Sequence, residues 1–166
     1  MSTGLSSSSA ASASARSFWQ AGSATRRAVF GFVAGAVVVL TVFQATLYLF
    51  YAIGALDSPP PDLSPTKPFG VPVVFSSAFF GGLWGILFAM LEPRLPRGAG
   101  FWVAALAFGI VPLNLVLWFV VAPLKGYSVG FGFAPKDVVI NIVLQASWGF
   151  GMAIAYAPFG RGAKQH

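Results

Sequence analysis

The sequence contains no cysteine, one histidine (His166) and only four acidic residues. Without cysteine the chain forms no disulfide, offers no thiolate to a metal ion and has no cysteine nucleophile. A single histidine excludes histidine-based zinc sites and haem held by two histidines. Charged residues make up 8% of the chain, against roughly 25% in ordinary globular proteins. So few charges cannot cover a surface that faces water, so we expect the solvent of this chain to be a lipid bilayer.

Long apolar runs dominate what is present, and 57% of the residues are hydrophobic. Four runs are long enough to cross a bilayer as helices, and proline-rich or glycine-rich polar segments separate them. The sequence therefore predicts an all-α fold, an integral membrane four-helix bundle. The expected helices cover about residues 28–56, 71–91, 100–122 and 138–157, within a membrane domain of residues 26–158.

The two ends of the chain differ from this domain. Residues 1–25 are rich in serine and alanine and lack hydrophobic periodicity, which predicts a disordered cytoplasmic tail. Residues 159–166 form a second, short cytoplasmic tail. The first tail also has the composition of a mitochondrial transit peptide. We expect a bacterial inner membrane, with the mitochondrial inner membrane as the alternative.

The basic residues indicate the orientation. They lie in short segments between the apolar runs instead of forming a stripe, so no nucleic acid partner is expected despite the net charge of +6. With four spans, both termini and the turn at 92–98 share one side. That side carries Arg16, Arg26, Arg27, Arg94, Arg97, Arg161 and Lys164, and the other carries Lys67, Lys125 and Lys136. The excess of positive charge predicts that both termini are cytoplasmic.

Small residues recur at every fourth position in the second and fourth runs. The first row is Ser77, Gly81, Gly85 and Ala89, and the second is Asn141, Gln145, Gly149 and Ala153. Residues four apart share one helix face, and small residues let helix backbones approach closely. We expect close packing of helices within the chain, with homo-oligomerisation as the alternative. The rows are 64 residues apart, which leaves open a duplication into two parallel-repeat hairpins, with an offset of 70 between the first and third runs.

Polar side chains near the middle of the apolar runs form the candidate intramembrane site. An amide exposed to lipid would lose its hydrogen-bond partners at a cost of several kcal/mol, so we expect the amides to face the bundle interior. They either hydrogen-bond between helices or line a polar site for a small solute or cofactor. No acidic or basic residue lies inside a run, so no catalytic residue, metal site or cofactor is predicted. The candidate cluster is Thr41, Gln44, Tyr48, Asn114, Asn141 and Gln145.

Several short sequence segments give the chain a resemblance to a known class of membrane proteins. They are 69–72 (FGVP), 81–85 (GGLWG), 93–98 (PRLPRG) and 121–126 (VAPLKG). Over about residues 28–157 the chain resembles small four-span proteins of bacterial inner membranes to which no activity is assigned. The resemblance implies a bacterial membrane location and brings no functional residues with it.

Three functions are compatible with this pattern. The first is a non-enzymatic membrane protein that serves as a structural or accessory component of a membrane assembly. The second is a small oligomeric transporter or channel in which the amides line a polar path. The third is a membrane enzyme acting on a lipid-like substrate, although the chain contains no recognisable catalytic base or nucleophile. The expected partners are the lipid bilayer and either another membrane protein or a second copy of the chain.

Overall fold

The computed structural model describes residues 24–66 and 70–160, and its helices confirm the predicted fold class. Four helices in these ranges are long and apolar enough to cross a membrane. They are Ala24–Ala52, Val73–Arg94, Ala99–Leu124 and Pro135–Pro158. The predicted tail at 1–25 lies outside the described residues except for its last two, which begin the first helix. Of the tail predicted at 159–166, residues 159 and 160 end the last helix and the rest lie outside.

Two of the four helices contain a wider π turn. The first helix, Ala24–Ala52, has one at η1 (Val39–Phe43) and ends in α2 (Gln44–Ala52). The second comprises α3 (Val73–Leu91) and a 3₁₀ turn, η2 (Glu92–Arg94). The third comprises α4 (Ala99–Val116), the π turn η3 (Leu117–Val121) and α5 (Ala122–Leu124). After the short 3₁₀ segment η4 (Val129–Phe133), α6 (Pro135–Gly160) completes the bundle.

Local chemistry explains why the helices begin and end where they do. The first helix stops at Ala52, four residues earlier than predicted, because Gly54 adopts a left-handed conformation with φ 74°. The amides of Gly54 and Ala55 donate to the carbonyls of Tyr51 and Phe50, which is the glycine-terminated helix end known as a Schellman motif. Pro72 precedes α3 in an extended conformation instead of entering its first turn.

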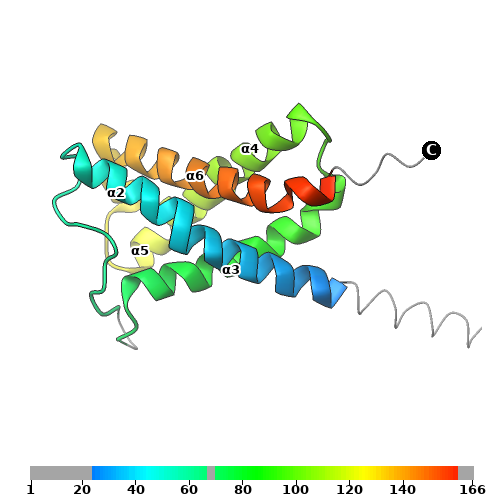
Figure 1. Cartoon of the computed structure of the whole chain (residues 1–166). Helices are drawn as coiled ribbons and strands as arrows, with labels where there is room; N and C mark the ends of the chain where they lie inside the picture. The colour runs from blue at the N-terminus through cyan, green and yellow to red at the C-terminus, as the bar shows by residue number, and fades with distance from the viewer. Residues whose placement is uncertain (1–23, 67–69, 161–166) are drawn as a thin grey trace, which may run out of the picture.

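Successive helices run in opposite directions along the bundle (Figure 1). The loop segments 53–66 and 70–72 and the loop at 125–134 lie at one end of the bundle, which we call the loop end. The turn at 95–98, the start of the first helix and the end of α6 lie at the other end, which we call the arginine end. This arrangement places the start of the first helix and the end of α6 on the same side of a membrane crossed by all four helices.

The first helix and α3 touch through their backbones. A Cβ atom added to Gly31 would lie 2.9 Å from the carbonyl carbon of Gly85, and one added to Gly35 would lie 2.9 Å from that of Gly81. Real Cβ atoms essentially never come closer than 3.0 Å. Glycine at all four positions is therefore what lets these two helices pack so closely.

The third helix and α6 form a second close contact at matching positions. A Cβ at Gly149 would lie 2.5 Å from the Ala105 carbonyl oxygen, and one at Gly109 would overlap the Gln145 carbonyl oxygen. Gly149 and Gln145 follow Gly85 and Gly81 by 64 residues, as the sequence rows suggested. Their partners Ala105 and Gly109 follow Gly31 and Gly35 by 74 residues, not by the 70 that the sequence suggested. The two hairpins therefore pack through equivalent positions.

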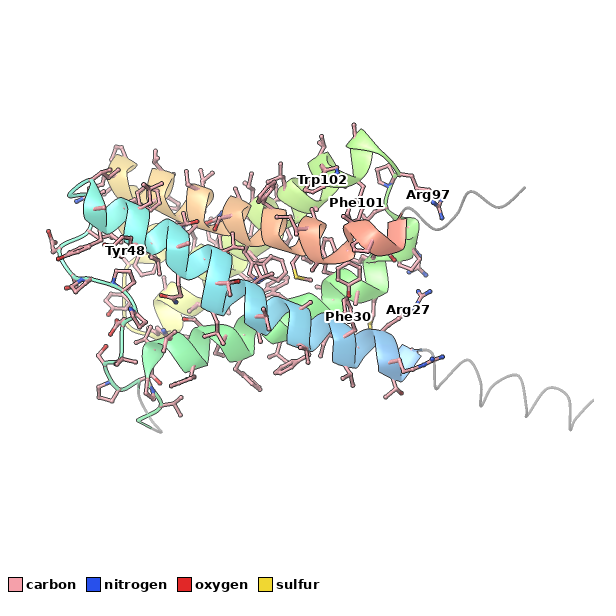
Figure 2. The ribbon with its side chains drawn as sticks, in the orientation of Figure 1. Arg27, Phe30, Tyr48, Arg97, Phe101 and Trp102 are labelled. Atoms are coloured by element: carbon pink, nitrogen blue, oxygen red, sulfur yellow. The ribbon has the colours of Figure 1, made fainter. Side chains whose placement is uncertain are left out.

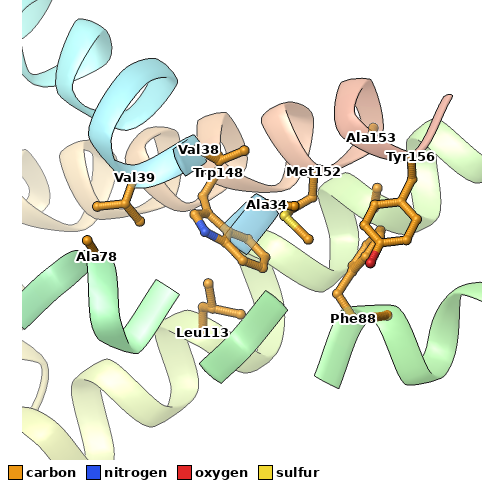
Figure 3. Close-up of a cluster of buried hydrophobic side chains, with 12 residues drawn as sticks. Ala34, Val38, Val39, Ala78, Phe88, Leu113, Trp148, Met152, Ala153 and Tyr156 are labelled. Carbon is orange, nitrogen blue, oxygen red and sulfur yellow. The ribbon is translucent and has the colours of Figure 1, made fainter. Parts of the chain in front are cut away.

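Bulky side chains fill the space between the two hairpins (Figure 3). Trp148, Phe88 and Met152 are at most 1% exposed. The Phe88 ring packs edge-on against Phe108 and Tyr156, with ring centroids 5.4 and 5.3 Å away. The Trp148 indole Nε1 donates a hydrogen bond of 3.3 Å to the Gly35 carbonyl and so links α6 to the first helix. The centre of the bundle is thus a packed apolar core.

Candidate intramembrane polar site

Asn114 is the most deeply buried of the predicted polar residues, with 2% of its surface exposed. Its Nδ2 donates to the Ile110 carbonyl of its own helix at 2.8 Å. Its Oδ1 is buried and, within the residues described, accepts no hydrogen bond. The amide faces the bundle interior as predicted, but its one hydrogen bond stays within its own helix.

Trp118 lies one helical turn beyond Asn114 and is not a member of the predicted polar cluster. Its indole Nε1 is also buried without a partner among the described residues. An unpaired donor and an unpaired acceptor therefore follow one another at i and i+4, where helix side chains are neighbours. Trp118 belongs to the π turn η3, and this widening of the helix has no signature that the apolar sequence reveals.

Gln44 lies on the first helix, directly after the π turn η1. The side chain is partly buried, and its Oε1 is closed off from solvent and, in the described part of the chain, unpaired. No interhelical hydrogen bond from Gln44 is observed among the described residues. Gln44 instead lines a groove on the outside of the bundle.

The other two residues of the predicted polar cluster on the first helix, Thr41 and Tyr48, do not face the bundle interior. Thr41 is exposed, and its hydroxyl donates to the Val37 carbonyl one turn back at 2.7 Å. Tyr48 is 61% exposed. A threonine satisfied within its own helix needs no partner on a neighbouring helix. The six predicted residues therefore do not face a single interior site.

Asn141 and Gln145 occupy the α6 row predicted from the sequence, and both are partly buried. The Gln145 backbone carbonyl lies against Gly109, one turn before Gly149 meets Ala105. Ala153 in the same row is fully buried. In the α3 row, Ala89 is 2% exposed, and Gly81 and Gly85 contact the first helix, while Ser77 is partly buried. Gly81 and Gly85 of one row, and Gln145 and Gly149 of the other, therefore lie in the close helix contacts.

The groove lies near the loop end, where the first helix, α3 and the proline-rich loop meet. Its volume is about 490 Å³, which falls within the range typical of small-molecule sites, about 300–1,000 Å³. Nine residues line it: Leu40, Gln44, Ala45, Tyr48, Pro60, Pro61, Leu63, Val74 and Phe75. It is an apolar surface with a polar amide and a phenol along the first helix.

The described charges divide between the two ends of the bundle. One end carries Arg26, Arg27, Arg94, Arg97 and Glu92, and Figure 2 shows Arg27 and Arg97 there, opposite Tyr48. The loop end carries Lys125, Lys136, Asp57, Asp62 and Asp137. Ser64 donates hydrogen bonds to the Asp62 carboxylate from its hydroxyl and its backbone amide, and these hold the pKa of that carboxyl below its ordinary value.

The buried polar side chains described above offer hydrogen-bonding groups and no charged ones. Within residues 24–66 and 70–160, no three histidine or acidic side chains converge as metal ligands. The amides of Gln44 and Asn114 and the indole of Trp118 can bind polar atoms but are poor proton donors and acceptors in catalysis.

Searches against protein-family models, curated proteins and solved structures found no match to the chain. The resemblance to small four-span bacterial proteins stays a prediction. The described residues form four helices that are long and apolar enough to cross a membrane, as in multi-pass helical membrane proteins.

Proposed function

We propose that the chain is a non-enzymatic integral membrane protein that serves as a structural or accessory component of a membrane assembly. This proposal rests on one observation, which is that packed side chains close the interior of the helix bundle. Two glycine-lined backbone contacts hold the hairpins together, and Trp148, Phe88 and Met152 fill the space between them. Such a bundle is a rigid body whose outer faces are its available surfaces.

The glycines of the membrane helices are not available for contact with a partner. The membrane glycines 31, 35, 81, 82, 85, 109, 149 and 151 each already meet another helix of the same chain. They are therefore occupied by packing within the chain. A second copy or another membrane protein would meet the bulky outer faces, such as Phe75, Phe79 and Leu83 on α3, which are 42–56% exposed.

The orientation belongs to the same proposal. Among the residues that the structure describes, the arginine end carries four arginines and one glutamate, and the loop end carries two lysines and three aspartates. Lysine and arginine accumulate on cytoplasmic loops. The arginine end, with both termini, then faces the cytoplasm of a bacterial cell.

A transporter or channel is the alternative, and the packing restricts it. A polar path through one chain would have to pass Phe88, Trp148 and Met152, which close the centre. Such a path would have to run between copies of the chain. Flux through proteoliposomes that fell to background when Gln44, on the outside of the bundle, was replaced by leucine would favour this alternative.

Purification of the full chain in mild detergent, followed by native mass spectrometry, tests the accessory role. We expect another membrane protein at fixed stoichiometry or a defined oligomer. Phe79→Ala with Leu83→Ala on α3, compared with Val103→Ala and Val111→Ala on α4, shows which outer face carries the contact. A strictly monomeric chain without any bound protein, from native membranes, contradicts the proposal.

A further inference from the structure

The close contact between the first helix and α3 brings two arginines together at the arginine end. The two helices run in opposite directions, and Gly31 of the first lies against Gly85 and Ala89 of α3. One turn before Gly31 is Arg27, and one turn after Ala89 is the turn η2, which ends at Arg94. Because residues four apart share one helix face, Arg27 and η2 are neighbours across the same contact.

The positive charge of these two arginines is not neutralised within the described part of the chain. Both side chains are exposed. Arg94 Nη1 donates to the Met90 carbonyl at 3.3 Å and so caps the end of α3, but this uses one of the five N–H groups of the guanidinium. Glu92 and Arg27 both lie within electrostatic range of the Tyr156 phenol, yet Glu92 forms no ion pair with a described arginine. Most N–H donors of both guanidinium groups can therefore bind an external anion.

Helix length places the pair at the level of lipid phosphates. The second helix, Val73–Arg94, has 22 residues and rises about 33 Å, slightly more than the roughly 30 Å of a hydrocarbon core. With this helix centred in the core, Arg94 lies among the head groups. Trp102 lies at the same end of the bundle (Figure 2), and tryptophan concentrates at the boundary between membrane and water. A guanidinium at this level reaches a phosphate without entering the hydrocarbon.

The charges at the two ends of the bundle determine which kind of head group fits. Among the described residues, four arginines and one glutamate give the arginine end a net charge of +3, whereas two lysines and three aspartates give the loop end −1. Anionic lipids attract basic side chains near the membrane surface, and a guanidinium binds phosphate oxygens through two parallel hydrogen bonds. The arginine end therefore favours a phospholipid with a net negative charge over a zwitterionic one.

We propose that Arg27 and Arg94 bind the phosphate group of an anionic phospholipid in the leaflet at the arginine end. The phosphate oxygens accept hydrogen bonds from both guanidinium groups. This inference rests on the four helices crossing a bilayer. It goes beyond the accessory role and does not depend on it, because both arginines belong to a single chain.

Native mass spectrometry of the full chain in mild detergent tests the site. The delipidated protein is titrated with phosphatidylglycerol and, separately, with phosphatidylcholine that has the same acyl chains. We expect the first phosphatidylglycerol to bind more tightly than phosphatidylcholine. Each arginine near the membrane surface contributes about fivefold to the affinity. Arg27→Gln together with Arg94→Gln should therefore weaken phosphatidylglycerol binding about 25-fold and remove the preference for it.

Matched variants separate this site from a general effect of charge. Lys125→Gln with Lys136→Gln removes the same charge from the loop end, which lies more than a Debye length away, and should leave binding within about twofold of the parent. Arg97→Gln, at the same end but beyond η2, should weaken binding less than Arg94→Gln. Arg94→Lys should keep the preference for phosphatidylglycerol, because it keeps the charge. Circular dichroism should give the same helix content for all variants.

Several outcomes overturn the proposal. They are equal affinity of the parent for the two lipids, an undiminished preference in the double arginine variant, and an equal loss in the double lysine variant. Displacement of phosphatidylglycerol by an equal concentration of inorganic phosphate, polyglutamate or single-stranded RNA also overturns it, because the occupant would then be a soluble anion. A chain that binds phosphatidylglycerol but has no protein partner contradicts the accessory role alone, so the two proposals fail separately.

Discussion

Replacing Gly85 with alanine tests the contact on which the first hairpin depends. The added Cβ would overlap the Gly31 carbonyl oxygen and lie 2.9 Å from its carbon and 3.1 Å from the Gly35 Cα. Ordinary contact begins at 3.4 Å, so relief of the carbon contact alone requires the helices to part by about 0.5 Å. All three atoms belong to the backbone, so no side-chain rotation can relieve the overlap.

The expected magnitude combines two opposing terms. Overpacking of a well-packed interior costs about 1–3 kcal/mol. Alanine regains up to about 1 kcal/mol of helix propensity relative to glycine. We therefore expect Gly85→Ala to lower the free energy of unfolding by about 1–2 kcal/mol. Titration of detergent micelles with dodecyl sulfate, followed by far-ultraviolet circular dichroism, measures this free energy.

Gly100→Ala is the matched control. A Cβ there meets only the Pro96 ring, at 3.1 Å, so the propensity gain should dominate and stability should be equal or higher. A Gly85→Ala protein as stable as the parent would refute the close backbone contact between the first helix and α3.

Two further predictions follow from the polar groups. Asn114→Leu should change the free energy of unfolding by less than about 1 kcal/mol, because Oδ1 has no described partner and Nδ2 bonds only its own helix; a larger loss in the same titration would show that Asn114 pairs with another group. Asp62 should titrate below its ordinary pKa of 3.8, because hydrogen bonds from Ser64 favour its carboxylate form. The loop contact should therefore be fully formed above pH 3.8 and lost as the pH falls through the lowered pKa. Ser64→Ala should raise that pKa, and carboxyl-carbon NMR of a protein labelled at aspartate would show no change if the contact did not form.

The helices themselves could be predicted because each is a long apolar run between proline-rich or glycine-rich segments. The first helix ends earlier than its hydrophobicity suggests, because Gly54 terminates it while the apolar sequence continues through Ala55 and Leu56. Pro135 lies at the start of α6, where its missing amide costs nothing, and so moves that start upstream of residue 138.

The candidate site was harder to predict, because polarity does not determine which way a membrane side chain faces. Asn114 faces inward, but Thr41 satisfies its hydroxyl within its own helix and Tyr48 lies at the surface. Gly81, Gly85 and Gly149 of the glycine rows lie in close helix contacts, while the identity of the facing helix depends on the whole bundle. The groove could not be predicted because two of its walls come from segments about 20 and 30 residues farther along the chain than Gln44.

We propose that all four apolar helices cross one bilayer with the arginine end in the cytoplasm. The chain has no cysteine, so single cysteines at Ser58, Ala99 and Ser128, all exposed, can be labelled without background. A membrane-impermeant maleimide applied to bacterial spheroplasts should label positions 58 and 128, and should label position 99 only after the membrane is permeabilised. Labelling of position 99 in intact spheroplasts, or protection of either loop position, would contradict this arrangement in the membrane.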